Sequence, residues 1–218
     1  MAQTKRLIIN ADDYGLAPGC NRAIEELFSV GAITSASCMA NKLTSMSGYL
    51  TGRSGVHLET IPAGTPPAVR RSWLSQVERF CHISSSPPTH FDTHHHVHGK
   101  EDLFPVYLEL CAFYGVACVP LIPAHRHDAR RAGVRCCDHA NIQWVDGQRS
   151  TLENLLKIDF SWAKTVHLMT HPGYVDDDLR RYSTMTLVRE RELEILRDPT
   201  FEVWLRSEGI ERISYEQL

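Results

Sequence analysis

Short apolar runs alternate with segments of helical periodicity along this chain, and this alternation is the feature that most constrains its fold. Residues 6–10, Arg-Leu-Ile-Ile-Asn, would be apolar on both faces of a strand, which is typical of a strand covered on both sides. The next segment begins at Pro18, has apolar residues at helical spacing up to Phe28, and can end at Gly31. Repeated alternation of this kind predicts an α/β protein with a parallel sheet.

The same reasoning predicts most of the remaining elements. Residues 123–148 are basic and irregular and receive no assignment, and the Ser/Thr/Gly-rich residues 41–55 predict a loop or a short helix. The length of 218 residues fits one (β/α) barrel or one doubly wound sheet better than two small domains. With no internal repeat or linker, we expect a single domain over residues 1–218. Further strands are expected at 33–39, 56–58, 91–93, 116–122 and 165–169, and helices at 68–80, 105–114 and 186–197, before a short terminal helix and an extended segment at 212–214.

Composition excludes several classes of partner. A formal charge of −3, from 23 basic and 26 acidic residues, provides no electrostatic reason to bind nucleic acid or an anionic membrane. No apolar run approaches the roughly 20 residues of a membrane span, and the N-terminus lacks a signal-peptide pattern, so we expect a cytoplasmic protein. The seven cysteines form no CxxC pattern, which favours reduced and mostly buried thiols.

Two adjacent carboxylates, Asp12 and Asp13, directly follow the first predicted strand. Ligands of parallel sheets collect at the carboxyl ends of the strands, so this pair is expected to face a binding site. Two neighbouring carboxylates repel each other unless a cation or a proton lies between them. The alternative is that one aspartate caps the next helix while the other is solvated.

Five of the 12 histidines lie within residues 90–98, at the end of another predicted strand. Neutral imidazole is the commonest metal ligand in proteins. In an extended segment His94, His96 and His98 would share a face, whereas in a helix His94 and His98 would lie together. Both geometries place His94 at the strand end, so it is the strongest candidate ligand, and a surface tract without a fixed role is the alternative.

Two single histidines also follow predicted strands. His57 is a weak signal by itself, but His171 lies in Thr-His-Pro-Gly, where the proline stiffens its presentation, and it suits general acid or base catalysis. We interpret His125, His127 and His139 as surface residues. Two histidines and one carboxylate around a cation leave coordination positions open for water and substrate, as in catalytic rather than structural metal sites.

These motifs together resemble the YdjC-like carbohydrate deacetylases, which are related to the NodB-type polysaccharide deacetylases. The resemblance extends over nearly the whole chain and includes residues 7–15, Leu-Ile-Ile-Asn-Ala-Asp-Asp-Tyr-Gly, and the closing residues 208–215. It also includes Thr34-Ser35, His57, residues 89–98 and Thr170-His171-Pro172-Gly173. It implies a distorted (β/α) barrel that hydrolyses the N-acetyl group of an amino sugar or glycoconjugate, and it suggests a homodimer.

The resemblance also implies the site residues. Asp13, His57 and His94 would hold a divalent metal, Zn or Mg, and Asp12 would be the base, while His171 would act as the acid. Two imidazoles and one carboxylate favour zinc or another transition ion. Tyr14, His98, Pro172 and Gly173 are expected around the substrate or behind the ligands, with a backbone N–H near Tyr14 or Gly15 facing the oxyanion. The stretches 41–55 and 57–94 are shorter than is usual in this family.

Two other functions fit the residues. A metal-dependent phosphoesterase or amidohydrolase would use His96-Val97-His98 as an HxH motif, although such barrels usually begin with HxH on the first strand. A non-catalytic metal- or sugar-binding protein would use the histidine tract as a chelator, and its metal binding would survive loss of Asp13 and His57.

Overall fold

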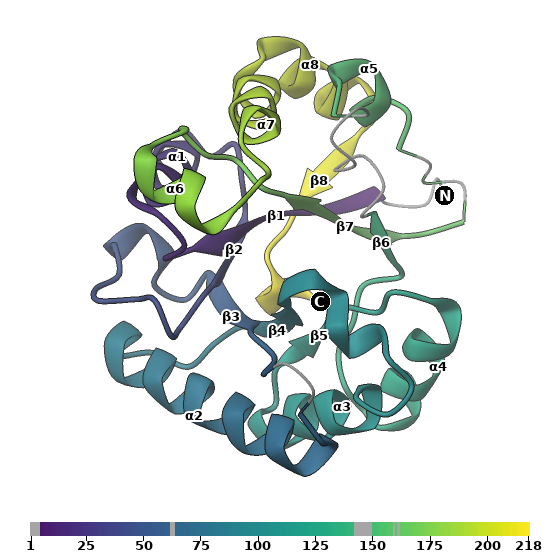
Figure 1. The fold of residues 1–218 in the computed structure, drawn as a ribbon. Coiled ribbons are helices and arrows are strands. Elements are labelled where there is room, and N and C mark those ends of the chain that lie inside the picture. The colour runs from purple at the N-terminus through teal and green to yellow at the C-terminus, as the bar shows by residue number, and fades with distance from the viewer. Residues whose placement is uncertain (1–4, 62–63, 142–149, 159, 161) are drawn as a thin grey trace.

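The centre of the protein is a curled sheet in which every strand pair is parallel (Figure 1). The computed structural model describes residues 5–61, 64–141, 150–158, 160 and 162–218. Within these residues the strand order is β5-β4-β3-β2-β1-β7-β6, and β8 also pairs with β1. The strands are β1 (Lys5–Tyr14), β2 (Ser35–Cys38), β3 (Ser54–Leu58), β4 (His90–Thr93), β5 (Ala117–Cys118), β6 (His139–Asn141), β7 (Thr165–Thr170) and β8 (Ile210–Arg212).

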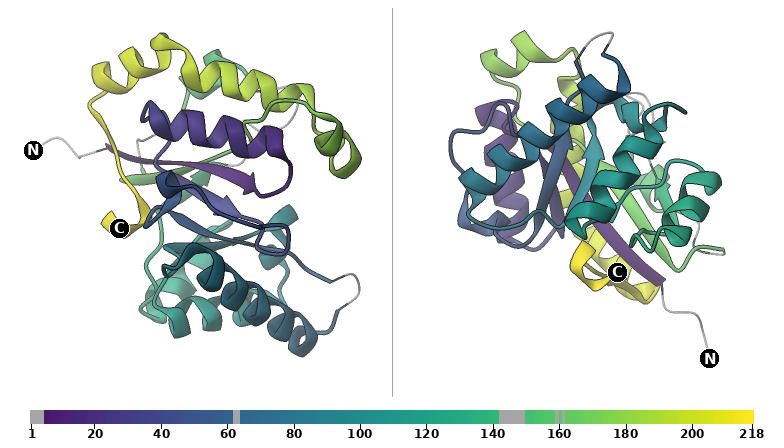
Figure 2. Two further views of the ribbon diagram at one scale, coloured as in Figure 1. Left: turned by 90° about the vertical axis from the view of Figure 1, so that its left-hand side faces the viewer. Right: turned by 90° about the horizontal axis from the view of Figure 1, so that it is seen from below.

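Helices surround this sheet on the outside (Figures 1 and 2). Outward side chains of the strands, such as Leu7 and Ile9 of β1, are fully buried in the main hydrophobic core. The longer helices are α1 (Pro18–Ser29), α2 (Pro66–Ser84), α3 (Phe104–Tyr114), α4 (Pro123–Arg131), α7 (Leu187–Arg197) and α8 (Pro199–Ser207). The short ones are α5 (Leu152–Leu155), α6 (Asp177–Tyr182) and the 3₁₀ turns η1 (Gly48–Leu50), η2 (His94–Gly99) and η4 (Tyr215–Gln217).

The inside of the curl has its own small apolar cluster, separate from the core under the helices. It contains Ile8 from β1 and Tyr215 from the C-terminal segment, together with Ala117, Val119, Ala140 and Ile213. The end strands β5 and β6 do not pair, but an isolated bridge between Cys118 and Cys136 joins β5 to the segment before β6. The architecture is therefore a distorted (β/α) barrel, as predicted. The start of β1 and the C-terminus lie at the end of the barrel opposite the carboxyl ends of the strands (Figure 2).

Most predicted elements are present, with differences in length. Strand β1 continues through Asp12 and Asp13 to Tyr14, so the aspartates are part of the strand end rather than of a following turn. The strand expected at 116–122 is reduced to two residues in β5. The unassigned stretch 123–148 contains α4 and β6, and its residues 142–149 lie outside the described part of the chain.

Two predictions made from composition, one about the cysteines and one about membrane spans, can also be compared with the structure. All seven cysteines are free thiols, and five of them are buried, as expected. None of the helices in the described residues combines the length and the apolar character that crossing a membrane requires.

Candidate active site

Asp12 and Asp13 are both buried at the tip of β1, although neighbouring residues of a regular strand point to opposite faces. The exception arises because Asp13 has a left-handed backbone, with φ of 70°, and the pairing of β1 with β2 shifts register between Ala11 and Tyr14. Such a conformation is uncommon outside glycine, although aspartate tolerates it better than most residues, and it is often found at functional sites. The irregular strand end therefore delivers both carboxylates to one cavity.

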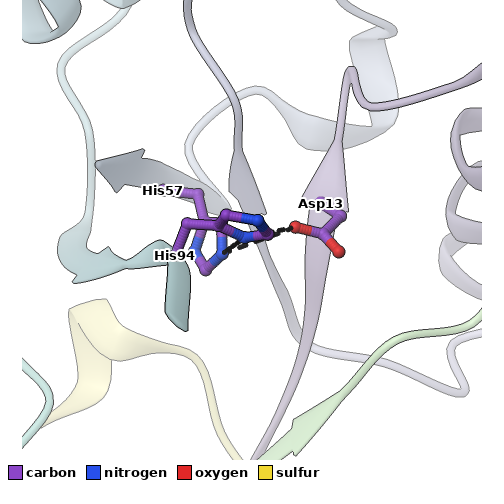
Figure 3. Close-up of side chains that lie close together, drawn as sticks. All are labelled: Asp13, His57 and His94. Atoms are coloured by element: carbon purple, nitrogen blue, oxygen red, sulfur yellow. Dashed lines mark hydrogen bonds and ion pairs between the residues drawn. The ribbon is translucent and has the colours of Figure 1, made fainter. Parts of the chain in front are cut away.

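Asp13, His57 and His94 point toward one another from β1, β3 and the end of β4 (Figure 3). Asp13 Oδ1 lies 3.4 Å from His57 Nε2 and 3.4 Å from His94 Nδ1, and these two ring nitrogens are 3.3 Å apart. The three candidate ligand atoms thus converge on one point. Predicted from separate motifs, these three residues are brought together by the barrel.

The chemistry of this group fits a divalent cation. Asp13 Oδ1 is buried and has no hydrogen-bond partner among the described residues, although its neighbour Oδ2 accepts a bond of 2.6 Å from Arg189. One carboxylate and two imidazoles are the donor set of transition-metal sites with open coordination positions. Such a site without its cation is expected to have a buried carboxylate oxygen that lacks a donor and faces two ring nitrogens.

Asp92 on β4 supports His57 from behind. Its Oδ1 lies 2.7 Å from His57 Nδ1, so Nε2 is the ring nitrogen that faces Asp13. Burial opposes a charge on His57, but Asp92 and then Asp12 outweigh it and raise the pKa of His57 to about 10. Asp92 lies within the motif at residues 89–98, but its role could not be recognised from the sequence, and a carboxylate behind a ligating histidine is common in metal sites.

Asp12 faces a different set of partners. Its Oδ1 accepts a hydrogen bond of 2.6 Å from Asn10 Nδ2, and its Oδ2 lies 3.7 Å from His171 Nε2. His171 follows β7, and burial lowers the pKa of its imidazole to about 3, so the ring is neutral near pH 7. Its Nδ1 has no partner among the described residues.

The pKa values of the two adjacent aspartates are shifted in opposite directions. Burial, followed by the negative charge of Asp92, raises the pKa of Asp12 well above its usual range. Burial also opposes ionisation of Asp13, but His94 and Arg189 outweigh it and hold the pKa of Asp13 well below its usual range. Paired groups whose pKa values are separated in this way commonly divide the roles at an active site.

Helix α7 contributes two charged residues that the sequence analysis missed. Arg189 and Glu192 are almost fully buried, at 2% and 0% exposure, in a helix whose sequence is rich in charged residues. Glu192 Oε2 accepts a bond of 2.6 Å from the backbone N–H of His171, and burial raises the pKa of Glu192 to about 7. Their burial could have been predicted from the sequence, because both residues lie at helical spacing from Leu193 and Leu196, on the same face of the helix.

The histidine tract adopts neither of the two geometries considered. His95 and His96 both have left-handed backbones, with φ of 57° and 53°, so the chain turns sharply after His94. His94, His95 and His96 line the cavity, whereas His98 is fully buried away from it, with Nδ1 2.5 Å from Thr93 Oγ1 and Nε2 3.0 Å from the Val119 carbonyl. His96 and His98 therefore do not form an HxH ligand pair.

Other predicted positions lie apart from the cavity. Tyr14 is buried and donates its hydroxyl to Glu25, and the Gly15 N–H donates to Asn21, so it is not directed at an oxyanion. Pro172 and Gly173 are buried behind His171, where the Gly173 N–H bonds the Arg189 carbonyl. His125 is not a surface residue as expected, because its ring stacks on Phe104 at 3.7 Å.

The candidate ligands and the Asp12–His171 pair open into one cavity of about 490 Å³. Part of its wall comes from the end of α6, where Tyr182 is 59% exposed, and from the segment that follows it. The cavity therefore combines a charged floor with an accessible aromatic side chain. It is lined by Asp12, Asp13, Leu16, His57, Thr93, His94, His95, His96, Met169, His171, Tyr182, Ser183, Thr184, Met185 and Arg189.

A family model described as YdjC-like protein matches residues 6–59 and 41–207 of the chain. The chain belongs to the YdjC-like family. The carbohydrate deacetylase of Geobacillus stearothermophilus is 28% identical over 242 aligned positions, which cover 96% of this YdjC-like protein and 96% of that enzyme. The chitooligosaccharide deacetylase of Proteus mirabilis HI4320 is 26% identical over 249 positions, covering 97% and 98% of the two chains.

A solved structure shows the same fold. It is that of a protein of Enterococcus faecalis V583 assigned a proposed role in cellobiose-phosphate cleavage. It superposes on this YdjC-like protein with a TM-score of 0.84 at 24% identity, over 98% of each chain. At that identity the likeness concerns the fold alone, and it confirms the distorted barrel.

Proposed function

We propose that this protein is a metal-dependent carbohydrate deacetylase, which hydrolyses the N-acetyl group of an amino sugar or glycoconjugate to release acetate. The observation that carries the proposal is the division of one cavity into two functional halves. Asp13, His57 and His94 form a ligand set on one side, while Asp12 and His171 form a proton-transfer pair on the other. The relatives named carbohydrate and chitooligosaccharide deacetylases align over almost the whole chain.

A divalent ion held by Asp13, His57 and His94 would polarise the amide carbonyl and make water more acidic. Zinc fits this donor set better than magnesium, because two of the three ligands are imidazoles. The ionised form of Asp13 is the ligating one, and its low pKa maintains that form.

In its ionised form Asp12 would take a proton from the attacking water, since its raised pKa makes it the more basic of the two adjacent carboxylates. His171 would protonate the amine nitrogen as the C–N bond breaks. Because His171 is neutral in the free site, it must first receive a proton, and Asp12 Oδ2 at 3.7 Å is the nearest acidic source. One water proton thereby reaches the departing amine, the water oxygen stays in the carboxyl group, and the second water proton is released as the acid ionises to acetate.

The test is acetate release from a panel of N-acetylated monosaccharides, chitooligosaccharides and glycoconjugates, with and without a chelator. We expect acetate from at least one substrate, loss of activity on chelation, and recovery on addition of zinc. Replacing Asp12 by Asn or His171 by Ala should each lower turnover about 10²-fold or more. Near wild-type turnover in both variants, or acetate release unaffected by chelation, would contradict the proposal.

A further inference from the structure

A fully buried serine, Ser37 on β2, lies directly beneath the candidate site and contacts three polar groups. Its hydroxyl oxygen is 2.8 Å from Asn10 Nδ2, 2.7 Å from Asp92 Oδ2 and 2.9 Å from His90 Nε2. None of these contacts involves a ligand directly. They do, however, connect both halves of the site to one atom.

The proton arrangement around Ser37 is determined by counting donors and acceptors. A hydroxyl has one hydrogen and two lone pairs, the Asn10 amide nitrogen can only donate, and an ionised Asp92 can only accept. The Ser37 hydrogen therefore goes to Asp92, which leaves a lone pair facing His90. His90 Nε2 must then carry a hydrogen and donate it to Ser37.

His90 is held in this tautomer from its other side. Its Nδ1 lies 2.9 Å from Thr89 Oγ1, which can donate to an unprotonated nitrogen, and burial lowers the pKa of the His90 imidazole to about 4. The ring stacks on Tyr215 at a centroid distance of 3.8 Å. Gly55 on the adjacent strand leaves the room it needs, because a Cβ there would lie 2.5 Å from His90 Nδ1.

Two arms extend upward from Ser37 to the site. Along the first, Asp92 accepts from Ser37 through Oδ2 and contacts His57 Nδ1 through Oδ1, at 2.7 Å, so Nε2 is the nitrogen left for a cation. Along the second, Asn10 Nδ2 reaches both Ser37 and Asp12 Oδ1, at 2.6 Å. One hydroxyl is thus shared by the metal side and the proton-transfer side.

We propose that Ser37 is a positioning residue, which holds His57 in its ligating orientation through Asp92 and holds Asp12 through Asn10, with His90 imposing the direction of the hydrogen bonds. The assignment of His57 as a ligand and Asp12 as a base rests on the proposed function. Ser37 touches neither the cation nor the substrate in this scheme. Its effect is exerted entirely through buried hydrogen bonds, which are strongly coupled in a low-dielectric interior.

The first experiment compares zinc affinity in Ser37→Ala and Ser35→Ala by competition with a chromophoric chelator. Ser35 is a matched control, because it is fully buried two residues earlier on the same strand, and within the described part of the chain its hydroxyl bonds only the Arg53 carbonyl, at 3.2 Å. Partners behind a ligating histidine typically contribute 10–100-fold to metal affinity. We expect Ser37→Ala to bind zinc about 10-fold more weakly, while Ser35→Ala stays within about twofold of wild type. Equal affinities in the two variants would overturn the proposal.

The second experiment needs no disruptive variant. Two-bond ¹H–¹⁵N spectra of the wild-type protein should show His90 as the neutral Nε2–H tautomer near pH 7, and His57 protonated only at Nδ1 when zinc is bound. An Nδ1–H tautomer for His90 would reverse the chain and overturn the proposal.

These results distinguish a failure of the role proposed for Ser37 from a failure of the proposed deacetylase function. A wild-type protein that binds zinc through Asp13 but releases acetate from no substrate contradicts the proposed deacetylase, and the affinity comparison still decides the role of Ser37. If the wild type deacetylates a substrate and Ser37→Ala binds zinc as tightly as the wild type, only the role proposed for Ser37 is contradicted. If the wild type binds no zinc at Asp13, the role of Ser37 in orienting His57 toward a cation is contradicted. The His90 tautomer then tests only the direction of the hydrogen bonds around Ser37.

Discussion

The two sides of the cavity are built in different ways. On one side Asp13, His57 and His94 lie at or directly after the ends of β1, β3 and β4, and each belongs to a short motif. On the other side Asp12 lies at the tip of β1 and His171 directly follows β7, while Arg189 and Glu192 reach the site from the buried face of α7. Strand ends are a local signal, whereas a helix contributes to a site only through the way it packs.

The comparison also assigns different tasks to the two sides. Under the proposed function, Asp13, His57 and His94 would hold the cation, while Asp12 and His171 on the other side would move protons. The predictions that follow test whether these tasks can be separated experimentally, beginning with the change that should have the largest effect.

Asp13→Ala should abolish both zinc binding and turnover, because it removes the one anionic ligand of the set. The loss of affinity should exceed the roughly 100-fold upper value for partners outside the ligand shell. Calorimetric titration with zinc and an acetate assay measure the two effects. Zinc binding that survives in both Asp13→Ala and His57→Ala would instead indicate a chelating histidine tract.

His171→Ala should lower turnover by about 10²- to 10⁴-fold, the usual contribution of a positioned acid or base, with zinc affinity nearly unchanged. The side chain lies 3.7 Å from Asp12, and Asp13, His57 and His94 form the candidate ligand group without it. Parallel measurement of kcat and of zinc affinity separates the two effects. A fall in affinity as large as the fall in kcat would show that the two sides of the cavity are not independent.

Arg189→Met should destabilise the zinc-free protein by about 3 kcal/mol, because it leaves the buried charge of Asp13 without its cationic partner. Zinc supplies a positive charge beside the same carboxylate, so the deficit should shrink when zinc is present. Chemical unfolding of wild type and variant, in chelator and in zinc, measures both values. An equal deficit under the two conditions would place Arg189 in packing rather than in charge balance.

Zinc affinity should rise with pH by about tenfold per unit near neutrality, since at least one proton must leave on binding. The responsible group is His57, whose pKa of about 10 means that the zinc-free protein holds a proton there at all lower pH values. Raising the pH removes this competition, so affinity increases toward pH 10 and then levels off. Titrations in buffers of different ionisation enthalpy count the protons released, and a count of zero would contradict the assignment.

Much of the fold could be predicted from local patterns. The apolar run at 6–10, the helix from Pro18 and the histidines after β4 were each recognisable because strand and helix periodicities depend on near neighbours. The predictions were weakest where strands are very short, as in β5 and β6, since two or three residues provide no periodicity.

The site could be predicted in part for the same reason. The candidates at strand ends were identified, but the burial of His98 away from the cavity was not, because the left-handed backbone of His95 and His96 cannot be inferred from a run of histidines. Ser37 and Asp92 were passed over, since a buried serine or aspartate in a strand looks ordinary until its partners are known.

By itself the sequence determined the alternation of strands and helices, the parallel sheet and the residues offered at strand tips, because these follow from side-chain spacing along a few turns or pleats. Only the tertiary structure decided that Asp12 and Asp13 share one cavity, that Arg189 and Glu192 are buried beside them, and that Ser37 joins the two arms. Those outcomes depend on distances between residues far apart in the chain, and on the desolvation that separates the acidities of two neighbouring aspartates.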